Sequence, residues 1–131
     1  MVHKQLSFVI TGILFKTHRE LGISRNEKQY GDFFEGLLKK ENINYKREFR
    51  FNDKFENGDM RCICDFVIDD KIILEFKVKD FITKEDYYQL KRYLESLEMQ
   101  LGILVNFRQN RLSPKRVLNA KFLEKNSRHS D

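Results

Sequence analysis

Two segments in the middle of the chain place an apolar residue at every second position, and this pattern constrains the fold more than any other feature. One runs from Met60 to Ile68 and the other from Ile72 to Val78. A period of two indicates β-strands with one buried face. Since only residues 69–71 separate the segments, they predict a hairpin of two antiparallel strands.

The register of this hairpin follows from the need to bring the two apolar faces together. Apolar residues occupy the even-numbered positions of both segments, so even positions must pair with even positions. The short connection then predicts these apolar pairs: Ile68 with Ile72, Phe66 with Leu74, and Cys64 with Phe76. On the other face, Asp65 is set directly opposite Glu75, and Lys77 is the diagonal neighbour of Asp65 at roughly 7 Å.

Directly opposed carboxylates repel each other, so Asp65 and Glu75 need a cation between them or a raised pKa on one of them. An ion that prefers oxygen ligands, Mg²⁺ or Mn²⁺, would resolve the conflict, stabilise a phosphoryl transition state and activate a bound water. Lys77 could orient or deprotonate that water, or neutralise charge on a phosphate. The alternative is that these three charges form the solvent face of an amphipathic hairpin, with Lys77 offsetting the acids.

The face that carries the charges is not wholly polar. It also carries three apolar residues, Ile63, Val67 and Ile73. The face is therefore expected to be partly buried, which favours the functional interpretation because buried charge is unfavourable unless it is used.

Helices and further strands are predicted on both sides of the hairpin. In order, the patterns predict a helix over 6–21, a helix from 27 through 38 capped by Asn26, a strand over 45–51, the hairpin, a helix over 84–97, a strand over 101–107 and a last helix over 114–123. The order α-α-β-β-β-α-β predicts an α/β fold with helices packed on the faces of a sheet.

Length and charge indicate one domain with a polyanionic partner. The 131 residues suffice for one hydrophobic core and no Pro-, Gly- or Ser-rich stretch divides them, so we expect a single domain over 1–131. The net charge is +5, and a basic C-terminal segment, 108–131, contributes much of it. Its basic residues up to position 128 are Arg108, Arg111, Lys115, Arg116, Lys121, Lys125 and Arg128. The segment is either a solvated tail or a contact for nucleic-acid phosphates.

The N-terminus and the cysteines bear on localisation. The apolar run from Phe8 to Phe15 is too short to span a bilayer and no signal cleavage site follows it, so we expect no membrane partner. Cys62 and Cys64 alternate on one strand without the geometry of a disulfide and are expected to be core thiols. Together these features predict a cytoplasmic protein.

Asp65, followed after nine residues by Glu75-Phe76-Lys77, resembles the D-x(n)-E-x-K signature of the PD-(D/E)XK nuclease superfamily. The order of blocks along most of the chain is similar to that of a group of small bacterial proteins named for a GxxExxY motif. The blocks are Thr17–Gly22, Glu27–Tyr30, Cys64–Ile68, Ile73–Lys77, Gln89–Leu94 and Gly102–Phe107. The chain departs from the motif at its glycine, because Ser24 lies three residues before Glu27.

The resemblance implies a restriction-endonuclease-like core, a mixed four-stranded sheet flanked by helices, and Mg²⁺- or Mn²⁺-dependent hydrolysis of nucleic acid, with DNA as the expected substrate. Asp65, Glu75 and Glu27 would bind the metal ion. Lys77 would be the catalytic lysine, and Gln89 would brace it or contact the substrate backbone. The alternatives are that Glu27 is a first-turn acid favoured by the helix dipole and that Gln89 is an exposed amide.

Three functions are compatible with these residues: a metal-dependent nuclease, a non-catalytic nucleic-acid-binding module that retains the fold, and a protein-interaction domain. The joint presence of all the site residues favours the enzyme, because such charges are lost first when a site decays. His18 is interpreted as a helix-terminus residue that contacts the last carbonyls of its helix, outside the catalytic set. A small domain with an open site could also act on two strands as a homodimer, for which the sequence identifies no interface.

Overall fold

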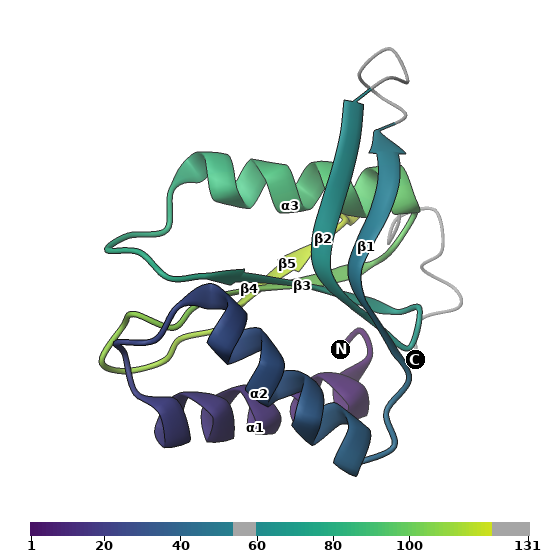
Figure 1. Cartoon of the computed structure of the whole chain (residues 1–131). Coiled ribbons are helices and arrows are strands. Elements are labelled where there is room, and N and C mark those ends of the chain that lie inside the picture. The colour runs from purple at the N-terminus through teal and green to yellow at the C-terminus, as the bar shows by residue number, and fades with distance from the viewer. Residues whose placement is uncertain (54–59, 122–131) are drawn as a thin grey trace.

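The computed structural model describes residues 1–53 and 60–121, and the elements within these ranges form an α/β fold (Figure 1). In chain order they are α1 (Lys4–Leu21), α2 (Glu27–Lys40), β1 (Tyr45–Asp53), β2 (Met60–Ile68), β3 (Ile72–Lys77), α3 (Lys84–Leu97), β4 (Leu101–Asn106) and β5 (Lys115–Leu118). The predicted fold class and the predicted order through β4 are confirmed. No helix in these two ranges is long and apolar enough to cross a lipid bilayer.

The strands form one mixed sheet in the order β1-β2-β3-β4-β5. Among the strands within residues 1–53 and 60–121, only β3 and β4 are neighbours that run parallel, because α3 crosses over between them. The prediction of four strands, with a last helix over 114–123, is wrong at residues 115–118, which form a fifth strand. Val117 is buried opposite Gly102 while the residues on either side of it are exposed, so the segment has the period of a strand. Residues 122 and 123 of that predicted helix lie outside the described residues.

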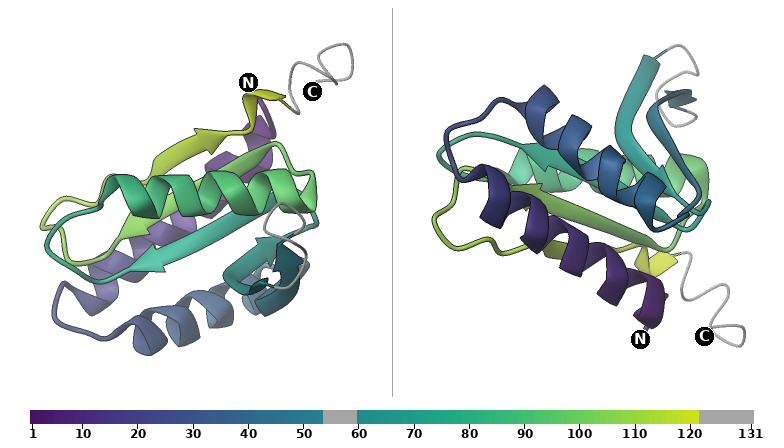
Figure 2. Two further views of the ribbon diagram at one scale, coloured as in Figure 1. Left: turned by 90° about the horizontal axis from the view of Figure 1, so that it is seen from above. Right: turned by 60° about the horizontal axis from the view of Figure 1, so that its bottom comes forward.

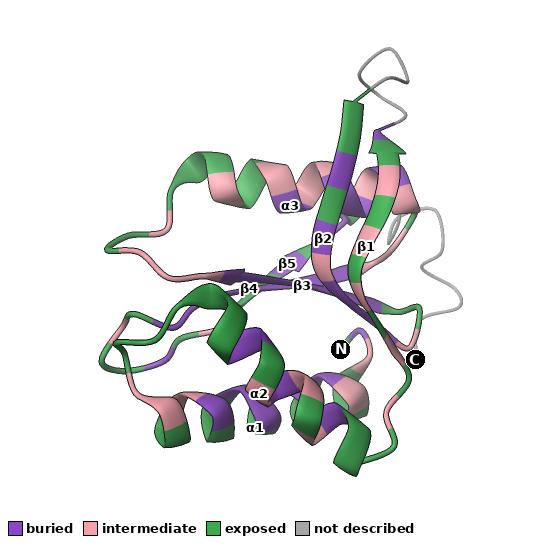
Figure 3. Ribbon diagram, in the orientation of Figure 1, coloured by how far each residue is buried: buried purple, intermediate pink, exposed green. Residues whose placement is uncertain are grey.

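Helices cover both faces of the sheet. α1 and α2 lie against one face and α3 lies against the other, while the β1–β2 hairpin rises toward α3 (Figures 1 and 2). Two hydrophobic clusters result: Phe34, Phe66 and Phe76 belong to the one under α1 and α2, and Leu90 and Leu94 to the one under α3. Every residue of β4 is buried, as the continuous purple of that strand shows (Figure 3).

The β2–β3 ladder follows the predicted register and then stops. Its pairs are Ile68–Ile72, Val67–Ile73 and Phe66–Leu74. The predicted pair of Cys64 with Phe76 is not formed, because β2 leaves β3 at Asp65 and bends with β1, where Glu48 has a positive φ of 52°. Cys64 therefore packs under α3 while Phe66 packs under α1 and α2, and the prediction that they share one face is wrong. Both cysteines are free and buried, as predicted.

Reciprocal side-chain caps fix the starts of α2 and α3. The Gln29 amide donates to Asn26 Oδ1 at 2.8 Å and the Asn26 amide donates to Gln29 Oε1 at 2.9 Å, which confirms Asn26 as the N-cap. Thr83 and Asp86 cap α3 in the same way. The caps fix the first turns of both helices. Glu27 lies in the first turn of α2, and Asp86 lies in the first turn of α3.

Candidate active site

The strands β2 and β3 separate at Asp65 and Glu75, and these two side chains fill the gap between the backbones. The Asp65 amide donates to Glu75 Oε2 at 2.8 Å, and the Phe76 amide donates to Asp65 Oδ2 at 2.7 Å. Each carboxylate thus replaces the carbonyl that a continued ladder would supply. The fork between the strands brings Asp65 and Glu75 together and fixes one oxygen of each.

Burial makes this acid pair electrostatically unfavourable. Burial raises the pKa of Glu75 to about 9, and repulsion from Asp65 adds to the rise. Burial also raises the pKa of Asp65, although the hydrogen bond from the Phe76 amide and the charge of Lys77 oppose the change. The pair therefore holds a proton at neutral pH, which a bound cation would displace.

Glu27 stands at the start of α2, on the edge of a pocket of about 210 Å³ that opens beside Asp65. The pocket is lined by Glu27, Lys28, Gly31, Arg47, Glu48, Asp65, Phe66 and Phe76. Partial burial raises the pKa of Glu27, the charge of Asp65 raises it further, and Lys77 lowers it. The structure thus brings the third predicted acid within electrostatic reach of the fork, on a more exposed position than the other two.

Lys77 ends β3, and its ammonium group lies 3.8 Å from Asp86 Oδ1 on α3. Asp86 Oδ2 also pairs with Lys79, so two lysines share one carboxylate whose side chain is only 11% exposed. Burial would raise the pKa of Asp86, but hydrogen bonds from Lys79 and Thr83 outweigh it and the pKa is lowered. No sequence pattern singles out Asp86, because an acid in the first turn of a helix is common.

Asn106 at the end of β4 holds the chain that follows Lys77. Its buried side chain donates from Nδ2 to the Lys79 carbonyl at 2.7 Å and accepts from the Lys79 amide at 3.2 Å. Oδ1 also accepts from the Arg108 amide at 3.2 Å. The side chain extends the β3–β4 ladder past its last pair, Lys77 with Asn106. The sequence feature that could have indicated this role is a polar amide at the end of a continuous apolar strand, since a buried amide needs hydrogen-bond partners.

Two further predicted residues lie near these elements. Gln89 is on α3, three residues after Asp86 and partly buried, and its side chain makes no hydrogen bond with residues 1–53 or 60–121. His18 donates from Nε2 to the Gln109 carbonyl at 2.7 Å, so it joins α1 to the loop after β4. The prediction that His18 contacts the last carbonyls of its own helix is wrong.

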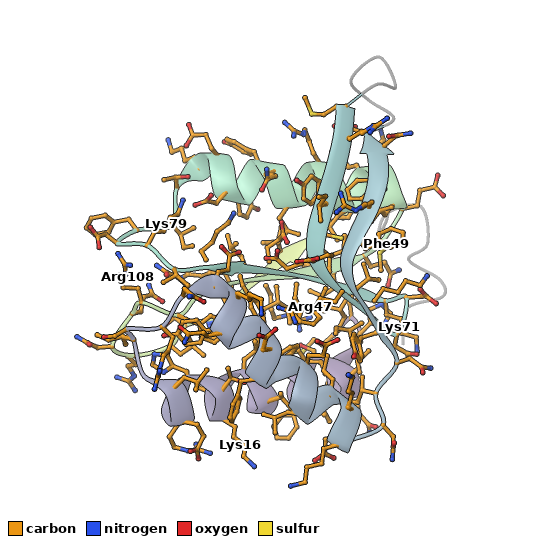
Figure 4. The ribbon with its side chains drawn as sticks, viewed as in Figure 1. Lys16, Arg47, Phe49, Lys71, Lys79 and Arg108 are labelled. Carbon is orange, nitrogen blue, oxygen red and sulfur yellow. The ribbon has the colours of Figure 1, made fainter. Side chains whose placement is uncertain are left out.

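A second charged cluster lies next to the fork, between α2 and β1, and its two acids, Asp32 and Glu35, are balanced by Arg47 and by Lys28, whose Nζ lies 2.8 Å from Asp32 Oδ2. Arg47 Nη1 lies 2.7 Å from Asp32 Oδ1 and 2.9 Å from Glu35 Oε1, and the Tyr45 hydroxyl donates to Glu35 at 2.6 Å. The hydrogen bond from Tyr45 is the main reason that the pKa of Glu35 is lowered. Arg47 lies over Gly31, where a Cβ would overlap its Nη2, and Figure 4 shows Arg47 between α2 and the sheet.

The donor set of the fork suits a hydrated hard cation. Within residues 1–53 and 60–121, no group of three or more His, Cys, Asp or Glu is arranged to hold a metal ion. Asp65 and Glu75 are in place as two carboxylates, with Glu27 farther out. Mg²⁺ usually keeps several waters and takes one or two protein carboxylates, so two acids suffice for such a site. The raised pKa of Glu75 agrees, because a cation would relieve the repulsion from Asp65 that contributes to it.

The basic segment predicted over 108–131 is in part a structural element. Arg116 lies in β5 and donates to Ser7 Oγ near the start of α1 at 2.5 Å. Arg111, in the loop before β5, is exposed. The charge of Arg116 therefore serves the fold, whereas Arg111 stays a candidate for phosphate contact. The part of the prediction that falls on 122–131 lies outside the described residues.

A comparison with family models decides what kind of fold this is. Residues 4–117 match the model described as the PD-(D/E)XK nuclease superfamily. The chain belongs to this superfamily. The match spans the fork, α3 and the end of β4, so the PD-(D/E)XK assignment covers every element described above except the last residue of β5.

Comparison with solved structures finds a similar fold. The crystal structure of SSO0001 is similar with a TM-score of 0.50 and 19% sequence identity, covering 90% of this chain and 72% of that one. At this identity the likeness concerns the fold alone. No curated protein matches the sequence. PD-(D/E)XK proteins are typically nucleases and generally use divalent metal ions, which agrees with an acid pair at the fork.

Proposed function

We propose that this PD-(D/E)XK protein is a metal-dependent nuclease that hydrolyses nucleic-acid phosphodiester bonds, with DNA as the expected substrate. The observation that carries the proposal is the fork of β2 and β3, which holds Asp65 and Glu75 together in a buried place. A purely structural role, accepting from the Asp65 and Phe76 amides, would be served as well by two neutral side-chain amides, because two neighbouring buried acids oppose folding.

The acids have distinct roles in this proposal. Asp65 and Glu75 would hold Mg²⁺ or Mn²⁺, and Glu27 would reach the ion directly or through a water. A bound divalent ion supplies stabilisation of phosphoryl charge and lowers the pKa of a water. The chain contributes preorganisation, because the amides of Asp65 and Phe76 each fix one carboxylate oxygen before any ligand arrives.

Lys77 would orient the attacking water or neutralise charge on the scissile phosphate. Asp86 holds its ammonium group in the free protein, and Asn106 fixes the backbone two residues further on. Gln89 lies on the same helix as Asp86 and would brace Lys77 or contact the substrate backbone.

Within the superfamily, we assign the chain to the GxxExxY group. Glu27 and Tyr30 have the spacing of the E and Y of that motif. The Tyr30 hydroxyl donates to the Gly22 carbonyl, and its ring stacks on Phe107 with centroids 4.3 Å apart. These contacts anchor the first turn of α2, which gives the ExxY spacing a physical purpose: the tyrosine fixes the turn that carries Glu27. Ser24, in place of the motif glycine, lies in the loop before α2.

A non-catalytic nucleic-acid-binding module is the second candidate. The observation in its favour is that no three-residue metal cluster is assembled within residues 1–53 and 60–121.

One experiment separates the two candidates. Purified protein is incubated with labelled single- and double-stranded DNA and RNA in Mg²⁺, Mn²⁺ or EDTA, with Lys77→Ala purified in parallel to detect contaminating nucleases. The nuclease proposal predicts cleavage by the parent in one of the metals and none in EDTA or by the variant. Binding without cleavage under every condition would support the non-catalytic module, and cleavage that survives EDTA would contradict the metal dependence.

A further inference from the structure

An exposed aromatic surface lies beside the proposed active site, on loop 78–83 and the first turns of α3. Phe81, Tyr88 and Tyr87 are 79%, 59% and 39% exposed. Phe81 follows Lys77 by four residues, so their Cα atoms are at most about 14 Å apart. The rings of Tyr87 and Tyr88 contact each other, and large rings in contact at the surface mark interaction sites more often than isolated ones do.

The backbone on both sides of Phe81 is held in place. Before it, Asn106 binds the amide and the carbonyl of Lys79, and the side chain of Lys79 pairs with Asp86. After it, Thr83 is the N-cap of α3 and exchanges hydrogen bonds with Asp86. Figure 4 shows Lys79 at the same end of the molecule as Arg108, whose amide Asn106 also binds. The loop therefore presents the Phe81 ring to solvent from an anchored backbone.

Basic side chains adjoin the rings on α3. Lys84 precedes Tyr88 by four residues and Lys91 follows Tyr87 by four, which makes them neighbours on the helix surface. The Lys91 ammonium group lies 5.7 Å from the centroid of the Tyr87 ring. The rings of Tyr87 and Tyr88 meet edge to face with centroids 5.8 Å apart.

Two acids share this part of the surface. Glu85 is exposed in the first turn of α3, and Asp80 precedes Phe81. Asp80 lies 3.5 Å from Arg108 Nη1, which offsets its charge. Counting Lys84 and Lys91, the surface retains an excess of positive charge and is complementary to phosphate.

We propose that this aromatic surface, made of Phe81, Tyr87, Tyr88, Lys84 and Lys91, binds unpaired nucleotides of a nucleic acid beside the proposed cleavage site. Exposed rings stack on bases and lysines contact phosphates, which is the combination that serves single strands without reading their sequence. Bases inside a duplex are already stacked on one another and cannot use the rings. The inference rests on the proposed nuclease function and adds the substrate class, a single strand or a locally unpaired end.

The molecule supplies its own control for an exposed ring. Phe8 on α1 is 80% exposed, nearly the same as Phe81, and α1 lies on the opposite side of the sheet from α3 (Figure 1). It tests whether any exposed phenylalanine affects binding or only the one beside Lys77.

Binding is measured by fluorescence anisotropy in EDTA, so that cleavage cannot interfere, with labelled single-stranded DNA, single-stranded RNA and the matching DNA duplex. Phe81→Ala, Phe81→Leu and Tyr88→Ala are compared with Phe8→Ala, and thermal unfolding of each variant verifies folding. We expect Phe81→Ala and Phe81→Leu to raise the Kd for single strands roughly five- to a hundredfold, with little change for the duplex and none for Phe8→Ala.

Equal Kd values for Phe81→Ala and Phe8→Ala would overturn the inference and leave the surface to a protein partner. An equal loss for duplex and single strand would overturn it as well. Cleavage assays on the same proteins keep the two proposals apart. If the parent cleaves and the Phe81 variants bind normally, the nuclease proposal stands and the inference fails; a parent that neither binds nor cleaves nucleic acid contradicts both.

Discussion

Two clusters of charged groups adjoin each other between α2 and the sheet, and the fold treats them in opposite ways. The balanced cluster consists of Lys28, Asp32, Glu35, Tyr45 and Arg47, and hydrogen bonds lower the pKa of each of its acids. The acid cluster consists of Glu27, Asp65 and Glu75, and burial raises the pKa of all three. Acids with a lowered pKa stabilise the folded state when they are ionised. Acids with a raised pKa destabilise it when they are ionised, and such acids are typical of functional sites.

The two clusters do not differ in location, since Arg47 and Asp65 line the same pocket. They differ in whether each acid is paired with a cation. Asp32 and Glu35 have the Arg47 guanidinium within 2.9 Å. The cation nearest the fork in sequence, Lys77, is paired instead with Asp86 on α3. The acid cluster is thus left without a direct cationic partner among the residues that the structure describes, which is the condition that a metal ion would satisfy.

The largest expected effect separates the two clusters by activity. Asp65→Asn should lower cleavage at least about a hundredfold, because the neutral amide cannot hold the cation or the developing charge. Asp32→Asn, in the balanced cluster, should leave cleavage within about twofold of the parent. Rates are measured on the same labelled substrate in Mn²⁺. If both variants lose cleavage activity to a similar extent, the difference between the two clusters is unrelated to function.

The next effect separates them by stability against pH. The pKa of Glu75 is about 9 in the folded protein, against 4.5 as its ordinary value. Between these values the folded state binds more protons than the unfolded state, so the contribution of Glu75 to stability falls as pH rises. Glu75→Gln keeps an oxygen for the Asp65 amide and removes the titration. We expect it to stabilise the metal-free protein by about 1–3 kcal/mol near pH 8, and much less near pH 5.

Glu35→Gln should change the stability near pH 8 in the opposite direction. The lowered pKa of Glu35 means that its stabilisation is present above its ordinary pKa and is lost as pH falls through its folded value. The variant should therefore destabilise the protein near pH 8 by about 1 kcal/mol. Urea unfolding of both variants in EDTA measures the two differences, and the same sign for both near pH 8 would remove the contrast between the clusters.

A smaller effect concerns the support of Lys77. Asn106→Asp loses the donor to the Lys79 carbonyl and should lower kcat roughly tenfold with little change in KM, because the lysine is displaced and binding surfaces remain. Asn119 is an equally buried amide that donates to the Met99 carbonyl at 3.2 Å, away from the fork, so Asn119→Asp is the matched control. If kcat falls by the same amount in both variants, the effect of Asn106→Asp is a general loss of packing and not a specific effect on Lys77.

The sequence predicted the parts of this structure that local patterns determine. Alternation and a short connection gave the β2–β3 hairpin and its first pairs, and an asparagine before an apolar stripe gave the start of α2. Patterns of period two do not report bends, so the departure of β2 at Asp65, and with it the placement of Cys64 under α3, was missed. The sequence predicts a helix at β5 because its alternation is seen only in burial: Val117 and Leu118 are both apolar, but only Val117 is buried.

The candidate site divides in the same way. Asp65 and Glu75 could be placed together because both belong to one hairpin. The contacts of Lys77 with Asp86 and of Lys79 with Asn106 join segments brought together by the α3 crossover, and no local pattern specifies them. The roles of Glu27, Gln89 and the other site residues stay predictions.

The measurement that tests the central claim most directly pairs Mn²⁺ calorimetry with cleavage on Lys77→Ala, using Asp65→Ala alongside. The account predicts that Lys77→Ala binds Mn²⁺ at least as tightly as the parent, because the two carboxylates remain and only a repelling cation is lost, and that it does not cleave. Asp65→Ala should lose both properties. Full activity in Lys77→Ala, or parental Mn²⁺ affinity in Asp65→Ala, would contradict the assignment of the fork as a metal-dependent active site.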